Sequence, residues 1–101
     1  FFDVMLLGLG DDGHTASLIP GQPVLEERAK WVAPVLHGRD EQRITLTYPA
    51  LESSRTIAFL VTGAAKAQTV AQVRSGDSAL PAARIRPHGT VMWFLDSAAA
   101  G

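Results

Sequence analysis

Residues 2–18 read F-D-V-M-L-L-G-L-G-D-D-G-H-T-A-S-L, and this stretch decides the fold of the chain. Its first half, residues 2–9, is a mainly apolar run without alternation, which is typical of a strand buried on both faces of a sheet. A glycine-rich turn that carries two aspartates and a histidine leaves this strand directly. Such polar groups contribute little to packing, so the turn is a candidate active-site loop.

The three glycines of residues 8–13 also have the G-x-G-x-x-G spacing of a dinucleotide-binding turn, and they follow a strand as that motif requires. The motif needs a sustained helix whose amino terminus faces the pyrophosphate, but Pro20 and Gly21 interrupt the chain soon afterwards. Asp11 and Asp12 would also place carboxylates beside the pyrophosphate. These features argue against a nucleotide site.

Asp12 and His14 allow a different interpretation of the turn, as part of a catalytic site. One residue separates them, so in an extended loop their side chains point the same way. A neighbouring carboxylate fixes the tautomer of an imidazole and raises its basicity, which suits a general base. Gly10 and Gly13 would let the loop approach a substrate closely. From spacing alone, a tight turn with helix-capping aspartates and an exposed histidine remains an equal alternative.

The rest of the chain alternates strands with helices, which predicts an α/β fold. Strands are expected at residues 31–36, 43–48, 56–61 and 90–95, and helices at 15–18, 49–51 and 64–74, with a helical turn within 22–30 and a frayed tail at 96–101. We therefore predict an open, mostly parallel Rossmann-like layered sheet with flanking helices, forming a single partial domain over residues 1–101. Ligands of such sheets bind beyond the carboxyl ends of the strands, which here are residues 10–14 and 62–66.

Lys66 lies in the first turn of the helix expected after the 56–61 strand. The helix dipole and the ammonium group both favour an anion there, although a lysine in this position is more often a solvated side chain. Arg43 opens another expected strand and would reach the same crevice if it faced inward. A surface arginine is the simpler interpretation.

The composition indicates an ordinary globular protein, with 101 residues of which 47% are hydrophobic and 19% charged. A net charge of −1 gives no electrostatic case for nucleic acid, and no apolar run approaches the roughly 20 residues that cross a membrane. The lack of cysteine excludes disulfides, thiolate catalysis and cysteine-ligated zinc, and no third ligand accompanies Asp12 and His14 for a metal. The tryptophans are expected in the core and the remaining histidines in solvent, namely Trp31, Trp93, His37 and His88.

Residues 8–21, G-L-G-D-D-G-H-T-A-S-L-I-P-G, resemble the active-site signature of 6-phosphogluconolactonases, whose superfamily includes glucosamine-6-phosphate deaminases. The resemblance continues through R-I-T-L-T at 43–47, F-L-V-T-G-A-A-K-A at 59–67, L-P-A-A-R at 80–84 and W-F-L-D at 93–96. Deaminases typically follow the shared Gly-His with Phe-Asn-Glu-Pro. This chain has S-L-I-P at 17–20, the lactonase form, with Ile19 where phenylalanine is more usual.

The resemblance implies a cytoplasmic enzyme of the pentose phosphate pathway that hydrolyses 6-phosphoglucono-δ-lactone to 6-phosphogluconate without a cofactor. It implies that His14 is the general base, that Asp12 orients it, and that Lys66 helps to bind the phosphate. Arg43 is a less certain substrate-binding candidate, as are the glycines of residues 10–13. The residues do not identify the donors that would stabilise an oxyanion, for which the backbone N–H groups of the glycine turn are candidates.

Members of this family are usually much longer than this chain. Their amino-terminal half carries a glycine-rich loop and an arginine that also bind the phosphate, and nothing in this sequence matches those. We therefore expect the chain to be a carboxy-terminal half whose partner is the missing amino-terminal half, and to be weak or inactive alone. Two other functions remain open: a sugar-phosphate isomerase or deaminase, and a non-catalytic module that binds sugar phosphates.

Overall fold

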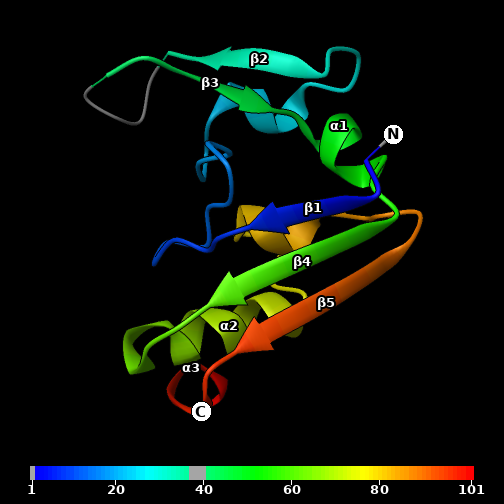
Figure 1. Cartoon of the computed structure of the whole chain (residues 1–101). Coiled ribbons are helices and arrows are strands. Elements are labelled where there is room, and N and C mark those ends of the chain that lie inside the picture. Colours follow the sequence, from blue (N-terminus) through cyan, green and yellow to red (C-terminus); the bar gives the residue numbers. More distant parts are fainter. Residues whose placement is uncertain (1, 37–40) are drawn as a thin grey trace.

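Three parallel strands form the central sheet of the structure, a computed structural model that describes residues 2–36 and 41–101. They are β1 (Val4–Leu7), β4 (Thr56–Val61) and β5 (Thr90–Leu95), hydrogen-bonded in the order β1-β4-β5 (Figure 1). Leu7 pairs with Phe59, and Phe59 pairs with Trp93, so the carboxyl ends of the three strands lie at one edge of the sheet. The predicted α/β fold with a mostly parallel sheet is confirmed.

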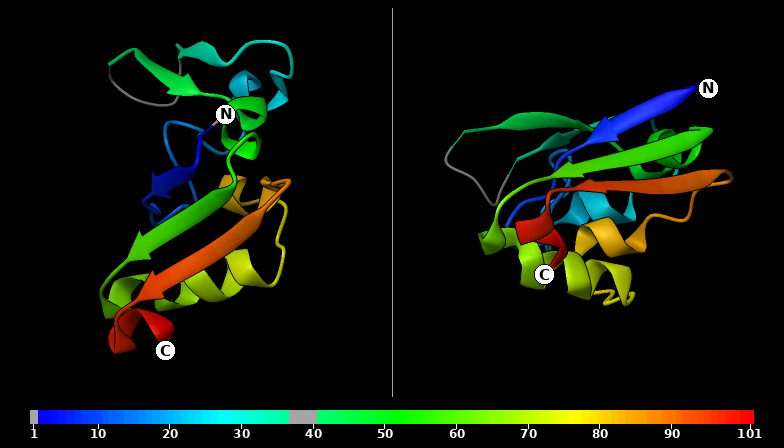
Figure 2. Two further views of the ribbon diagram at one scale, coloured as in Figure 1. Left: turned by 45° about the vertical axis from the view of Figure 1, so that its right-hand side comes forward. Right: turned by 60° about the horizontal axis from the view of Figure 1, so that its bottom comes forward.

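The helices that follow β4 and β5 pack on one face of this sheet (Figure 2). They are η2 (Ala64–Lys66), α2 (Ala67–Arg74), η3 (Pro81–Arg84) and α3 (Ser97–Ala100). Val70 and Val73 of α2 are buried in the same core as Phe59 of β4. The Phe59 ring stacks on the Trp93 indole with 4.3 Å between ring centroids. Full burial of a side chain of this kind stabilises the fold by about 1.5–3 kcal/mol.

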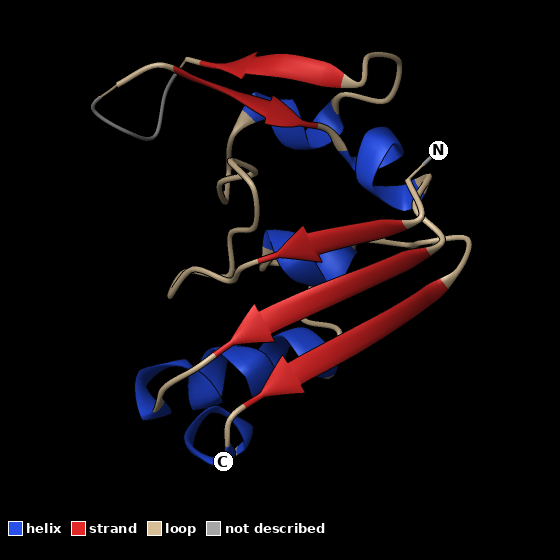
Figure 3. Cartoon of the chain, viewed as in Figure 1, coloured by secondary structure: helices blue, strands red, loops and turns tan. Residues whose placement is uncertain are grey.

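A second sheet of two strands lies apart from the first (Figure 3). It pairs β2 (Val32–Val35) with β3 (Arg43–Leu46) in antiparallel register, with Ala33 opposite Thr45. Both strands of such a sheet have a free edge, which accommodates Pro34 because proline cannot donate a hydrogen bond to the ladder. Two short helices flank this sheet in the chain, η1 (Pro23–Glu26) before it and α1 (Tyr48–Glu52) after it.

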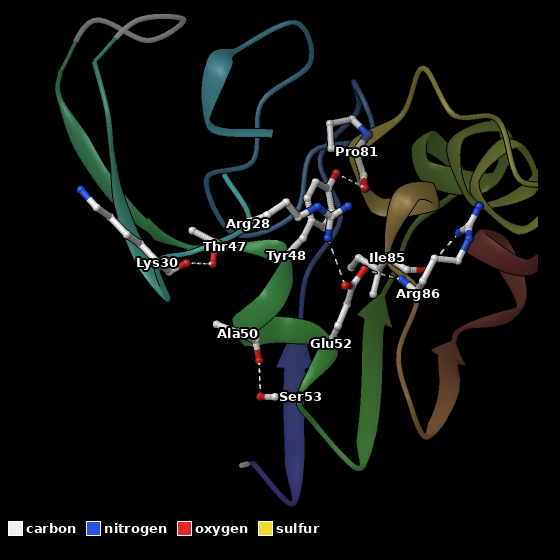
Figure 4. Close-up of polar contacts among 10 residues, drawn as sticks. All are labelled: Arg28, Lys30, Thr47, Tyr48, Ala50, Glu52, Ser53, Pro81, Ile85 and Arg86. Atoms are coloured by element: carbon white, nitrogen blue, oxygen red, sulfur yellow. Dashed lines mark hydrogen bonds and ion pairs between the residues drawn. The ribbon is translucent and has the colours of Figure 1, made fainter. Parts of the chain in front are cut away.

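A buried tyrosine at the start of α1 joins this helix to η3 (Figure 4). Tyr48 is fully buried, and its hydroxyl donates to the Pro81 carbonyl at 2.6 Å. This burial raises the pKa of Tyr48 to about 12, because a phenolate there would lose its hydration. At the other end of α1, Glu52 accepts hydrogen bonds from the Arg28 guanidinium at 3.2 Å and from the Arg86 backbone N–H at 2.7 Å.

The helix predicted at residues 15–18 is wrong. Thr15 and Leu18 form an isolated antiparallel bridge instead, and Ala16 in the turn between them has a φ of 51°. The Ser17 backbone N–H donates to the Thr45 hydroxyl of β3 at 3.0 Å. The segment is therefore held by a tertiary hydrogen bond that a continuing helix would not make.

The frayed tail predicted at residues 96–101 is also wrong, because α3 forms there. The Asp96 side chain caps this helix by accepting from the Ala99 backbone N–H at 2.8 Å, and Ala99 is buried. Asp96 also accepts from the Gly63 backbone N–H at 3.2 Å. The tail is thereby joined to the turn that follows β4.

The predictions of core or solvent positions for the tryptophans and histidines are confirmed for some residues and wrong for one. Trp31 is 41% exposed, so its predicted place in the core is wrong: it precedes β2 and its ring lies 6.3 Å from that of Phe2. Trp93 is half-buried against the core, as predicted, and His88 is exposed, as predicted. His37 lies outside the described residues. Within those residues, no helix is long and apolar enough to cross a membrane.

Candidate active site

The candidate active-site loop follows β1 over residues 8–18, and hydrogen bonds within the loop fix its shape. The Gly10 N–H donates to the His14 carbonyl at 2.8 Å, and the Gly13 N–H donates to the Gly10 carbonyl at 3.0 Å. The buried Thr15 hydroxyl donates to the carbonyl of the loop's first residue, Gly8, at 2.8 Å. The loop is thus a closed turn that returns His14 to the carboxyl end of β1.

Two glycines of this turn leave room for other side chains. A Cβ atom on Gly10 would lie 2.1 Å from the His14 ring, so the imidazole packs directly over the Gly10 backbone. Gly13 has a φ of 82°, which favours glycine, and a Cβ atom there would lie 2.6 Å from Leu80. Contacts within the chain therefore explain why both positions require glycine. Their predicted close approach to a substrate stays a prediction.

Asp12 and His14 form a hydrogen-bonded pair on the surface of this turn. The Asp12 Oδ1 atom lies 2.6 Å from His14 Nδ1, and the same oxygen accepts from the His14 backbone N–H at 3.1 Å. An ionised carboxylate can only accept, so Nδ1 carries the proton of this contact and Nε2 is left as the basic nitrogen. The two side chains are 42% and 30% exposed respectively, so water can reach the pair. This arrangement can orient a general base.

Lys66 reaches the same loop from the neighbouring strand. It ends η2, the short helix that follows β4, and its Nζ atom lies 2.7 Å from Asp11 Oδ1. The Thr69 hydroxyl of α2 donates to the Asp11 carbonyl at 3.1 Å, which fixes this part of the turn against the helix. The carboxyl ends of β1 and β4 therefore bring together the two segments that the sequence singled out. The Lys66 side chain is 26% exposed, whereas that of Asp11 is 81% exposed.

An open hollow of about 360 Å³ lies beside the imidazole. It is lined by the loop itself, from Gly8 to Gly10 and from His14 to Ala16. Arg43 lies elsewhere: it pairs with Glu41 at 2.6 Å and lines a separate hollow beside β3. The structure thus brings Lys66 to the loop that carries His14 through its contact with Asp11, whereas Arg43 lines a different hollow, which it shares with Ser17 at the far end of the loop.

Asp11 is the residue of this site whose contact sequence reasoning missed. In the sequence, Asp11 is a carboxylate unfavourable to a nucleotide and a candidate helix cap, yet its side chain pairs with Lys66 and its backbone carbonyl accepts from Thr69. These partners come from a distant part of the sequence, and the sequence pattern held no signal for the contact. Across residues 2–36 and 41–101, no three or more His, Cys, Asp or Glu side chains group to hold a metal ion.

Comparison with known proteins decides the family. The family model described as glucosamine-6-phosphate isomerases/6-phosphogluconolactonase matches residues 1–93. The chain belongs to this family. The resemblance of its glycine turn to the lactonase signature is confirmed at the level of the family.

Two curated members of the family are similar to almost the whole chain. A 6-phosphogluconolactonase of Rattus norvegicus is 47% identical over 103 residues, covering 98% of this chain and 40% of its own length. A 6-phosphogluconolactonase of Homo sapiens is 46% identical over 104 residues, with the same coverage of 98% and 40%. The chain therefore spans about 40% of the length of these curated relatives.

Among solved structures, the crystal structure titled devB protein is similar to this chain with a TM-score of 0.86. It is 40% identical, and the match covers 98% of this chain and 43% of that one. The parallel sheet and its flanking helices are thus shared with an experimentally determined relative.

Proposed function

We propose that this chain is the carboxy-terminal part of a longer lactonase that hydrolyses 6-phosphoglucono-δ-lactone to 6-phosphogluconate in the pentose phosphate pathway. The observation that carries the proposal is the Asp12–His14 pair, with 2.6 Å between Oδ1 and Nδ1, in a loop at the carboxyl end of a parallel strand. Family membership and relatives named 6-phosphogluconolactonase support the choice of substrate. The cytoplasmic location stays a prediction.

In this mechanism, His14 Nε2 accepts a proton from water as the water oxygen bonds to the lactone carbonyl carbon. The Asp12 carboxylate stabilises the imidazolium that forms, because it keeps its hydrogen bond to Nδ1–H. The tetrahedral intermediate then collapses by breaking the bond between the acyl carbon and the ring oxygen. The imidazolium returns its proton to that oxygen, so one water is consumed and the ring opens to the acid.

Three backbone N–H groups of the glycine turn are already engaged in hydrogen bonds within the loop. The N–H groups of Gly10 and Gly13 bond to carbonyls within the loop, and the His14 N–H bonds to Asp12. An oxyanion hole needs donors aimed at the developing charge, so these three groups are poor candidates in this conformation. In this proposal, the turn therefore serves to orient the His14 imidazole.

Lys66 supplies the positive charge for the substrate's phosphate in this proposal. Its ammonium group lies beside the His14 loop through its contact with Asp11, at 2.7 Å. A lysine binds phosphate as a point charge through three rotatable donors. Arg43, which lines a different hollow, stays a lesser candidate for substrate binding.

The test is to mix the full-length protein with 6-phosphoglucono-δ-lactone and follow 6-phosphogluconate above the spontaneous rate. Catalysed formation of the acid supports the proposal. Tight binding of 6-phosphogluconate without hydrolysis would instead favour a non-catalytic sugar-phosphate module.

The family's printed description also includes glucosamine-6-phosphate isomerases, which makes a deaminase or isomerase the second candidate. Incubation of the same protein with glucosamine 6-phosphate separates the two enzymes. Release of ammonia at a rate above that of lactone hydrolysis would overturn the lactonase assignment. The S-L-I-P sequence at residues 17–20, in place of Phe-Asn-Glu-Pro, leads us to expect none.

A further inference from the structure

The candidate active site contains an ion pair whose two partners differ in exposure. The Lys66 Nζ atom lies 2.7 Å from Asp11 Oδ1, and the two side chains are 26% and 81% exposed respectively. The Asp11 backbone is held in place, because its carbonyl accepts from the hydroxyl of Thr69, a buried residue of α2. The Asp11 carboxylate is therefore the partner that can turn into water while the backbone and the lysine stay in place.

Within the part of the chain that the structure describes, Lys66 is the one residue that pairs with the Asp11 side chain. The neighbouring Asp12 differs, because its carboxylate bonds to both the ring and the backbone N–H of His14. Ion pairs between exposed groups change an equilibrium constant by a factor of only about 1.5–5. A more highly charged anion can therefore replace the Asp11 carboxylate at the ammonium group.

The phosphate group of the proposed substrate is such an anion. It carries about −1.5 to −2 charges near pH 7 and three acceptor oxygens, whereas a carboxylate carries one charge. A phosphate oxygen and Asp11 Oδ1 that both bonded to the same Nζ atom would lie no more than about 6 Å apart. Like charges at that distance repel each other. The carboxylate and the phosphate therefore compete for Lys66.

We propose that Asp11 is a displaceable counter-ion of Lys66, which the phosphate group replaces when the substrate binds and which returns when the product leaves. Hydrolysis opens the lactone ring but leaves the phosphate unchanged, so Asp11 weakens the binding of substrate and product by the same factor. Such a uniform effect acts on KM and on product inhibition, and not on the chemical step. The inference rests on the proposed function, because it requires that Lys66 binds the substrate's phosphate.

The opposite role, in which Asp11 orients Lys66 for the phosphate, fits the geometry less well. An orienting carboxylate keeps its hydrogen bond while its partner works through another atom, as Asp12 does when it bonds to His14 Nδ1 and leaves Nε2 for the water. Asp11 instead contacts Nζ, which is the atom that the phosphate would need. Its bond is thus in the way of the ligand.

Asp11→Asn tests the competition, because the amide keeps the size of the side chain without its charge. Isothermal titration calorimetry on the full-length protein, at constant ionic strength, gives the Kd of inorganic phosphate and of 6-phosphogluconate. Asp3→Asn is the matched control. Asp3 is also highly exposed, lies 3.8 Å from the Arg55 guanidinium, and precedes the amino end of β1, whereas the candidate site follows the carboxyl end.

We expect both Kd values to fall by the same factor, about 2- to 5-fold, in Asp11→Asn and to stay unchanged in Asp3→Asn. The gain should vanish in a Lys66→Met background, because Asp11 acts through that lysine. A rise in Kd would show that Asp11 orients Lys66, and unchanged values would show that it does not compete. Either result would overturn the inference, as would an equal gain in the Lys66→Met background.

Calorimetry also separates this inference from the proposed function. If the full-length protein binds 6-phosphogluconate but hydrolyses no lactone, the lactonase proposal fails, while a lower Kd in Asp11→Asn still supports the counter-ion. If Lys66→Met leaves the Kd of inorganic phosphate unchanged, Lys66 does not bind phosphate, and the inference is overturned whether or not the lactone is hydrolysed.

Discussion

The Asp12 carboxylate matters most when His14 is protonated, which is the moment at which the base holds the proton of the attacking water. The two side chains meet at 2.6 Å, and the carboxylate also accepts from the His14 backbone N–H. Asp12 therefore orients the imidazole through two contacts. Because only one residue separates them, this pair was predictable from the sequence.

Replacing Asp12 by Asn tests this role at the level of one oxygen atom. The amide keeps the size of the side chain but lacks the negative charge, and its NH2 group can favour the wrong imidazole tautomer. We expect kcat for lactone hydrolysis to fall by about 10²–10⁴-fold. Asp77→Asn, at an exposed aspartate, is the control that should keep full activity. Unchanged kcat in Asp12→Asn would remove Asp12 from the mechanism.

Lys66→Met tests the phosphate-binding role, because methionine keeps much of the length of the side chain without its charge. We expect kcat/KM for the phosphorylated lactone to fall by about 10- to 100-fold, the usual range for a hydrogen bond to a charged group. Hydrolysis of glucono-δ-lactone, which has no phosphate, should not change. Lys30→Met, at an exposed lysine, is the matched control. Equal losses with both lactones would show that Lys66 supports the loop instead.

At the scale of elements, α1 and η3 are joined by the Tyr48 hydroxyl and the Pro81 carbonyl. Tyr48→Phe would remove the donor and leave that carbonyl without this partner, at a cost of about 1–3 kcal/mol in the free energy of unfolding. Urea unfolding at pH 7 measures this difference. An unchanged midpoint would show that the contact contributes nothing to stability.

The buried Tyr48 hydroxyl also predicts that the stability of the fold depends on pH, and the same variant tests this. Burial raises the pKa of Tyr48 to about 12, above its ordinary value of 10.0, so the folded state holds this proton more tightly than the unfolded state. The stabilisation is therefore complete below pH 10 and is lost as the pH rises towards 12. Urea midpoints should fall more steeply over this range in the natural protein than in Tyr48→Phe. Equal slopes of the urea midpoint against pH in the two proteins would show that Tyr48 is not the group responsible.

Sequence patterns located the strands and the helices α1 and α2, but not the bridge at residues 15–18 or the helix α3. Strands β4 and β5 match their predictions because buried apolar runs bounded by turns need no distant partner to be recognised. The bridge between Thr15 and Leu18 depends on a hydrogen bond from Ser17 to the distant Thr45, so local pattern predicted a helix there. Likewise, α3 forms because Asp96 caps it, which the small residues of the tail concealed.

At the scale of the whole molecule, the candidate site lies at the free-edge strand of a sheet that is open on one face. The loop that carries His14 was predictable, but its contact with Lys66 through Asp11 needed the fold, since it joins segments after two different strands. The chain spans about 40% of the length of the curated relatives, and we expect the rest of the proposed substrate site to lie outside this sequence.

The 101-residue chain alone is therefore expected to hydrolyse the lactone weakly or not at all, because it spans only about 40% of the length of the curated relatives. Its initial rate, compared with that of the full-length protein at equal concentration, measures this. Full activity from the 101 residues would show that they contain the complete site.

The central claim is that His14 is the base that activates water. The most direct measurement is the initial rate of 6-phosphoglucono-δ-lactone hydrolysis by full-length His14→Gln, with the exposed His88→Gln as the control. We predict that kcat falls by about 10²–10⁴-fold in the first variant and stays unchanged in the second. An unchanged kcat in His14→Gln would show that His14 is not the base.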